Sequence, residues 1–115
     1  MNYMILIYQG PMLHKMPTDP AEMAKAYAPW MAYTKALHDA GVWIAGSQLA
    51  GPEAATTVRV RDGKRQVQDG PYADTKEQLA GYYLINAPDL DAALEWGARC
   101  PGALNGIIEV RPQVG

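Results

Sequence analysis

Apolar side chains occupy both alternating sets of positions in three short stretches of the chain. In residues 3–8, one set is Tyr3, Ile5 and Ile7, and the other is Met4, Leu6 and Tyr8. Residues 42–45 and 82–85 repeat the pattern. Such runs are typical of strands that are buried on both faces. We therefore predict three strands here, within a sheet that is covered on each side.

A first helix is predicted at residues 19–40, where apolar side chains recur at helical spacing. Asp19 and Glu22 have the spacing of a capping box, so the helix should begin directly after Asp19. Pro29 lies inside the predicted helix. Because an interior proline removes a backbone hydrogen bond, we expect a kink or a broken turn near Ala26.

A second helix is predicted at residues 89–100, with Asp89 as its N-cap. Its inward-facing positions are expected to be Leu90, Ala93, Leu94 and Gly97. A last strand is expected at residues 107–111, directly before Pro112.

The clearest local signal is a β-hairpin between residues 56 and 68. The pair Asp62-Gly63 separates two segments of alternating character and is a strong signal for a two-residue turn. Residues 56–61 should pair with residues 65–68. Arginines alternate with valines in the first segment, so one face of this hairpin should be exposed to water.

Without the hairpin, the predicted order of elements is βαββαβ, the ferredoxin-like split motif. The predicted fold class is therefore α+β, ferredoxin-like with an inserted β-hairpin. The two helices of this motif cover one face of an antiparallel sheet. The other face would be a large apolar patch, which soluble monomers rarely expose. A second copy of the chain is the simplest cover, so we predict a homodimer; the pattern leaves open which alternating set meets the partner.

Length and charge narrow the function classes. The 115 residues are expected to form one domain spanning residues 1–115. The net charge of −2 comes from 10 basic and 12 acidic residues without any basic block, so nucleic-acid binding is not expected. The single cysteine, Cys100, favours a reducing, cytoplasmic setting. The first apolar run is too short to span a bilayer, so no membrane association is expected.

Four charged side chains precede the strand predicted at residues 82–86. They are Asp69, Asp74, Lys76 and Glu77. In a structural interpretation, Asp69 belongs to a turn with Gly70-Pro71, and Asp74 caps one helical turn. In a functional interpretation, the four side chains line the mouth of a pocket, where a lysine beside carboxylates can bind an anion or transfer a proton. The frequent occurrence of aspartate at helix caps favours the structural interpretation.

Histidine and cysteine offer few further candidates. His14 follows the first strand, where loops carry function, and is a candidate for ligand binding. His38 is expected to interact with the last carbonyls of its helix. The two histidines lack the spacing of metal ligands, so neither a metal site nor a cofactor is predicted. Cys100 lies at a helix C-terminus, where the helix dipole disfavours a thiolate, so it is not expected to be a nucleophile.

Three segments are similar to a known family. They are DGPYADTKEQLAGYYLI at residues 69–85, DLDAALEWGARCP at residues 89–101 and IIEVRP at residues 107–112. With them, nearly the whole chain closely resembles the DGPF type of YCII-related domain, Tyr72 standing where that family has Phe. The resemblance implies a ferredoxin-like fold paired into a dimeric α/β barrel. It also implies, for some relatives, a link to sigma factors of the extracytoplasmic-function class.

We retain two hypotheses for the function. The first is a small-molecule enzyme of lyase or isomerase type, in which Asp74 or Glu77 is the base, Lys76 stabilises an anion or enolate, and Tyr72 forms a wall. The second is a non-catalytic dimeric module that binds a ligand or regulates transcription through a sigma factor. Some branches of the wider YCII group pair a histidine on the first helix with an acidic residue. Because Trp30 falls near that histidine, a His-Asp mechanism is not expected here. The ligand-binding candidates are His14, Trp30, Asp69 and Tyr72.

Overall fold

The elements of the chain follow the predicted order, with two short additions. The computed structural model describes residues 1–11 and 17–115. Its strands are β1 (Asn2–Gln9), β2 (Trp43–Gln48), β3 (Thr56–Arg61), β4 (Lys64–Asp69), β5 (Gln78–Asn86) and β6 (Ile107–Pro112). Its helices are α1 (Pro20–Asp39), α2 (Leu90–Arg99) and the two additions, the 3₁₀ turn η2 (Pro52–Ala54) and α3 (Gly102–Asn105). His14, a predicted ligand-binding residue, lies outside the described residues.

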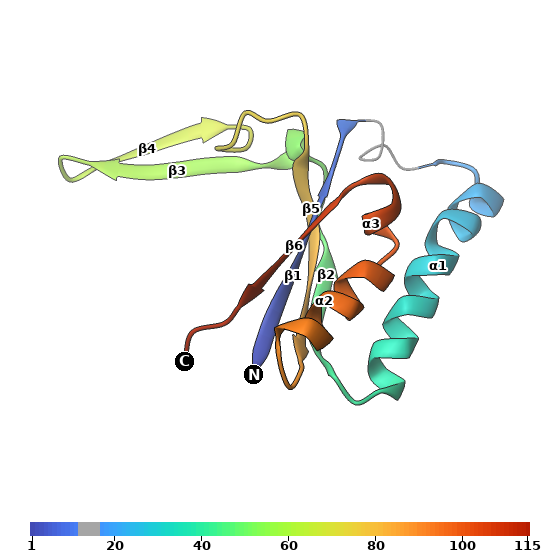
Figure 1. Cartoon of the computed structure of the whole chain (residues 1–115). Helices are drawn as coiled ribbons and strands as arrows, with labels where there is room; N and C mark the ends of the chain where they lie inside the picture. Colours follow the sequence, from blue (N-terminus) through green and yellow to red (C-terminus); the bar gives the residue numbers. More distant parts are fainter. Residues whose placement is uncertain (12–16) are drawn as a thin grey trace.

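Four strands form one antiparallel sheet in the order β2-β5-β1-β6. This order places the first and third strands of the βαββαβ motif side by side in the centre. Figure 1 shows α1 and α2 on the same side of this sheet. The arrangement is an α+β fold compatible with the ferredoxin-like motif. Among the described residues, no helix is both long and apolar enough to cross a membrane.

The β-hairpin expected between residues 56 and 68 forms a separate two-stranded sheet of β3 and β4. The strands pair along their whole length, so β4 is one residue longer at each end than predicted. Asp62 and Gly63 at the tip have φ angles of 53° and 72°. Positive φ at both central residues is what a type I′ turn requires, which explains the Asp-Gly pair.

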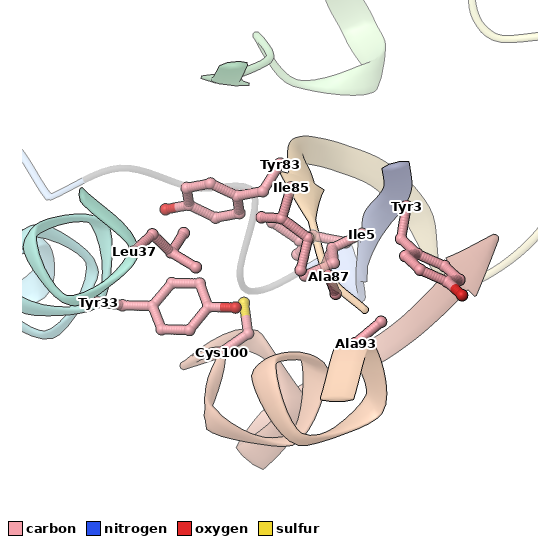
Figure 2. Close-up of a cluster of buried hydrophobic side chains, with 10 residues drawn as sticks. Tyr3, Ile5, Tyr33, Leu37, Tyr83, Ile85, Ala87, Ala93 and Cys100 are labelled. Atoms are coloured by element: carbon pink, nitrogen blue, oxygen red, sulfur yellow. The ribbon is translucent and has the colours of Figure 1, made fainter. Parts of the chain in front are cut away.

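The face of the sheet that carries the helices contains the core. Tyr3, Ile5 and Ile7 of β1 are buried there, and Ile5 is 0 % exposed. Figure 2 shows the side chain of Ile85 from β5 beside Ile5, and Leu37 from α1 belongs to the same buried cluster. The side chains of this layer are buried by contacts within a single chain.

The opposite face of the sheet, which we call the open face, is not covered by any helix of residues 1–11 and 17–115 (Figure 1). Its central side chains are those of Met4, Leu6, Tyr8, Tyr82 and Leu84. These residues are only partly buried, although all are apolar or aromatic. The structure thus decides which alternating set of β1 is available to a partner, which the sequence pattern left open.

Helix α1 differs from the prediction at its proline. Asp19 caps it, since a carboxylate oxygen accepts from the Glu22 backbone N–H at 3.1 Å. The helix then continues without interruption through Pro29, so the broken turn, one of the two alternatives predicted near Ala26, is absent. Packing accounts for the difference, because the turns after Pro29 bury Tyr33 in the core and tertiary contacts override local propensity.

Helix α2 uses a narrower contact face than predicted. Ala93 and Gly97 are buried as expected, but Leu90 and Leu94 are each 48 % exposed. The reason is a close approach to the sheet: a Cβ at Gly97 would lie 3.1 Å from a methyl carbon of Val110. Small residues face the strands directly, and the two leucines remain about half exposed.

Candidate functional site

The Asp-Gly-Pro-Tyr motif closes the base of the hairpin. Gly70 has a φ of 96°, a left-handed conformation that favours glycine. Its N–H donates to the carbonyl of Ala55, and its carbonyl accepts from the Thr57 hydroxyl, both at 2.8 Å. Tyr72 is 80 % exposed, and its ring centroid lies 5.8 Å from the guanidinium carbon of Arg59. These contacts are those of a structural turn.

Uncharged side chains organise the loop that follows. The side-chain amide of Gln78 donates to the carbonyls of Ala73 and Thr75 at 2.8 and 2.7 Å. The Thr75 hydroxyl donates to the carbonyl of Glu77 at 2.6 Å. No helical turn forms, so the prediction that Asp74 caps one is wrong. The physical reason is that Gln78 binds the loop carbonyls and at the same time begins β5, earlier than predicted.

The four charged candidates of this region are accessible to solvent. Asp69, Asp74 and Lys76 are exposed, and Glu77 is half-buried. Ion pairs among the described residues lie on α1 and β6, and none involves these four side chains. These side chains therefore lack the charged partner or deep burial that usually accompanies a general base.

A groove lies along α1 instead. It is a wide, open depression with a volume of about 500 Å³, and its lining is largely apolar. The residues that line it are Trp30, Met31, Thr34, Lys35 and His38. Positions 30, 34 and 38 follow each other at intervals of four, so they lie along one side of the helix. A smaller hollow of about 220 Å³ between α2, α3 and β6 is lined by small and aliphatic side chains.

Aromatic rings support one end of the groove. The imidazole of His38 stacks on Trp43 with ring centroids 4.5 Å apart. Trp43 in turn meets Tyr83 edge-on at 5.9 Å. A Cβ at Gly46 would lie 2.8 Å from a ring carbon of Tyr83 and 2.9 Å from one of Trp43, so glycine makes room for both rings. His38 therefore links the groove to a cluster of packed aromatic rings.

Two polar side chains of the groove, Thr34 and Lys35, are hydrogen-bonded to residues outside its lining. The hydroxyls of Thr34 and Tyr83 form a hydrogen bond at 3.1 Å. The ammonium of Lys35 donates to Asp39 at 2.6 Å. No aspartate or glutamate lines the groove. An apolar lining with a few engaged polar groups is suited to binding a small molecule, and it offers no free carboxylate as a base.

Two ionisable groups in the core are held in their neutral forms. Burial raises the pKa of Tyr33, whose hydroxyl donates to the carbonyl of Trp96 at 2.6 Å. Burial also raises the pKa of the Cys100 thiol to about 11. Figure 2 shows the two side chains next to each other. Neither is a base or a nucleophile near neutral pH, as expected for Cys100.

The structure separates the predicted site residues into two groups. Trp30 lines the groove on α1, whereas Asp69, Tyr72, Asp74, Lys76 and Glu77 belong to the segment between the hairpin and β5. Sequence reasoning missed Thr34 and Lys35, and it assigned His38 to the helix end. The interval of four between Trp30, Thr34 and His38 is the signal that could have grouped them. Within residues 1–11 and 17–115, no three His, Cys, Asp or Glu side chains are placed to hold a metal ion.

Comparison with known proteins gives two matches. The family model of the YCII-related domain matches residues 1–114. An uncharacterized protein of Rhizobium meliloti (strain 1021) is 44 % identical over 68 residues, which are 57 % of this chain. The match covers 55 % of that relative, so the chain spans about half of its length. Since the family model covers nearly every residue, the chain belongs to the YCII-related domain family.

Proposed function

We propose that the chain forms a homodimeric module that binds a small, largely apolar molecule in the groove on α1 and does not transform it. One observation carries this proposal: the groove has an apolar, aromatic lining without a carboxylate. Planar aromatic molecules suit such a lining, because they can stack on rings and need few polar partners. In this proposal the module is one cytoplasmic domain.

The homodimer is supported by the open face. Leu6, Tyr82 and Leu84 are neighbours on this face, where β1 and β5 pair. Each large apolar side chain removed from water contributes roughly 1.5–3 kcal/mol, so a few per chain outweigh a typical cost of association. Most homodimers are two-fold and self-complementary, and we expect this contact to bury more than about 2,000 Å² in total. The paired sheets would then form the dimeric α/β barrel that the resemblance implies.

An enzyme that uses the charged loop is the competing function. Asp74 or Glu77 would be its base, and Lys76 would stabilise an anion. The solvent exposure of Asp74 and Lys76 favours the binding module over this enzyme, because catalytic acids and bases are usually tuned by burial or by a charged partner. A sigma factor as regulatory partner belongs to the binding hypothesis, and co-purification with such a factor would support it.

The test is a binding screen with small aromatic molecules, read by saturation-transfer NMR. Met31→Asp places a charge on the groove at a residue that is 69 % exposed, so the fold should be unaffected. We expect this variant to weaken binding by about tenfold or more, since an ion would lie against an apolar ligand. Ala32→Asp is the matched control, because Ala32 is exposed on the same helix and does not line the groove.

Two outcomes would contradict the proposal. In one, none of the aromatic probes binds, or Met31→Asp and Ala32→Asp weaken binding equally. In the other, alanine substitution of Asp74, Lys76 and Glu77 abolishes binding or a detected reaction, which would favour the enzyme of the charged loop.

A further inference from the structure

The hairpin of β3 and β4, which we call the arm, carries an uncovered apolar stripe. Val58, Val60 and Val67 expose 60, 60 and 55 % of their surface. They share one face, because Val58 pairs with Val67 and alternate residues of a strand point the same way. A two-stranded hairpin alone is only marginally stable in water. Three exposed valines on one face therefore indicate a contact that the described part of the chain does not supply.

The shape of the molecule also points to a missing partner. The radius of gyration is 16.0 Å, whereas a compact domain of this length has about 13 Å. Figure 1 shows why: the arm projects far from the sheet, on the side away from the helices. This is also the side of the open face.

We propose that the arm is a dimerisation element whose valine stripe packs against the body of a second copy. This rests on the homodimer proposed above. Packed sheets lie about 10 Å apart, whereas a six-residue strand spans about 20 Å. The arm projects on the side of the open face, and it is longer than the spacing between two packed sheets. In a dimer that pairs the open faces, the arm should therefore extend beyond the partner's sheet and reach the layer of the partner's helices. Two-fold symmetry makes the contact reciprocal, so two arms enclose the pair.

The net charge of the arm favours a second copy of the chain as its binding partner. The arm carries four basic and two acidic side chains, which are Arg59, Arg61, Lys64, Arg65, Asp62 and Asp69. Its net charge is thus +2, and because the whole chain has −2, the rest carries −4. An arm of positive charge is attracted to a body of negative charge, and such complementarity orients partners as they meet. A second copy of this chain therefore supplies apolar surface for the valine stripe and a net charge opposite to that of the arm.

Substitution of the three valines by threonine tests the proposal. Threonine keeps the branched shape that strands favour, so the arm should still form, but it removes apolar contact. We expect the dissociation constant of the dimer to rise by about tenfold or more in sedimentation experiments. Gln66→Thr with Gln68→Thr is the control, because these residues point to the other face of β4.

Hydrogen exchange gives a second measurement that does not depend on a variant. The backbone amides of β3 and β4 in the wild-type protein should exchange slowly at high protein concentration and rapidly on dilution below the dissociation constant. Amides of β1 and β5 in the core are the internal reference and should stay protected in both conditions.

The outcomes separate the arm from the open-face contact. Leu84→Asp, on the open face, should produce monomers if the sheet contact is correct. Suppose that Leu84→Asp produces monomers but the valine variant keeps the wild-type dissociation constant. This result would refute the role of the arm in dimerisation and would still support the homodimer. The role of the arm would also be refuted if hydrogen exchange of the β3 and β4 amides did not depend on protein concentration. A wild-type protein that is monomeric at about 100 μM would overturn both proposals, because even a weak specific dimer forms there.

Discussion

Ile5 and Leu6 are neighbours on β1, but they lie on opposite faces of the sheet. Ile5 is fully buried under the helices, whereas Leu6 is only partly buried on the open face. Successive side chains of a strand alternate between faces, so one strand serves two kinds of packing. The covered face is buried within one chain, whereas the described part of the chain leaves the open face and the arm without a covering layer. Substitutions on the covered side should therefore change stability, and substitutions on the open side should change association.

The largest effect is expected for Ile5→Asp. Its side chain would place a carboxylate in the cluster that contains Leu37 and Ile85, where none of the described residues buries a charged group. Burying an unpaired charge costs several kcal/mol, comparable with the roughly 5–15 kcal/mol that stabilise a small protein. We expect loss of the cooperative unfolding transition, measured by circular dichroism during thermal denaturation. A variant that unfolds cooperatively near the wild-type temperature would show that the covered face has been assigned incorrectly.

The next effect concerns the open face. Leu84→Asp lies one residue before the buried Ile85 and points to the other side. The variant should fold, because a carboxylate in the monomer remains in contact with water. Its dimer should dissociate, with a dissociation constant at least about a thousandfold higher, because two charges would be buried at the contact. Sedimentation velocity at about 10 μM tests this, and a dimer that persists in the folded variant would refute the open-face contact.

A hydrogen bond inside the covered layer gives an intermediate effect. Tyr33→Phe removes the hydroxyl that donates to the Trp96 carbonyl at 2.6 Å and leaves that carbonyl without this partner. The cost should be about 1–3 kcal/mol in free energy of unfolding, measured by urea denaturation. Tyr72→Phe is the matched control on the other side of the molecule, because Tyr72 is 80 % exposed. It should change stability by less than about 0.5 kcal/mol. Equal losses of stability in Tyr33→Phe and Tyr72→Phe would argue against a difference between the buried layer and the exposed loop.

Much of the fold could be predicted from the sequence where the determining interactions are local. The caps at Asp19 and Asp89 each involve a backbone N–H three residues away, so their spacing is visible in the sequence. The Asp62-Gly63 turn likewise depends on the backbone conformation of those two residues. These predictions are confirmed, and the strand order agrees with the predicted motif.

What could not be predicted depends on contacts between distant segments. Periodicity cannot tell which face of β1 the helices cover, since both sets of side chains are apolar. The exposure of Leu90 follows from the close approach of Gly97 to β6, and the position of α2 over the sheet is not encoded in the helix alone. The groove has the same origin, because its aromatic backing joins His38 to Trp43 and Tyr83 from two strands.

The smallest effects distinguish two aspartates that look equivalent in the sequence. Asp89 caps α2 on the covered side and accepts from the Ala92 backbone N–H at 2.9 Å. Asp74 lies in the loop before β5, where no helical turn forms. Asp89→Ala should cost about 1 kcal/mol, in the range of about 0.5–2 kcal/mol for lost caps. Asp74→Ala should stay within about 0.5 kcal/mol, as exposed substitutions usually do.

Both aspartate variants should be measured by urea denaturation at one fixed protein concentration, because the apparent stability of a dimer changes with concentration. The informative quantity is the difference between their free energies of unfolding, since both variants replace an aspartate by alanine. A loss of about 1 kcal/mol or more in Asp74→Ala would restore the capping role that the loop geometry contradicts. Unchanged stability of Asp74→Ala together with loss of ligand binding would instead assign Asp74 to a functional site, and the charged loop would replace the groove as the place to look for chemistry.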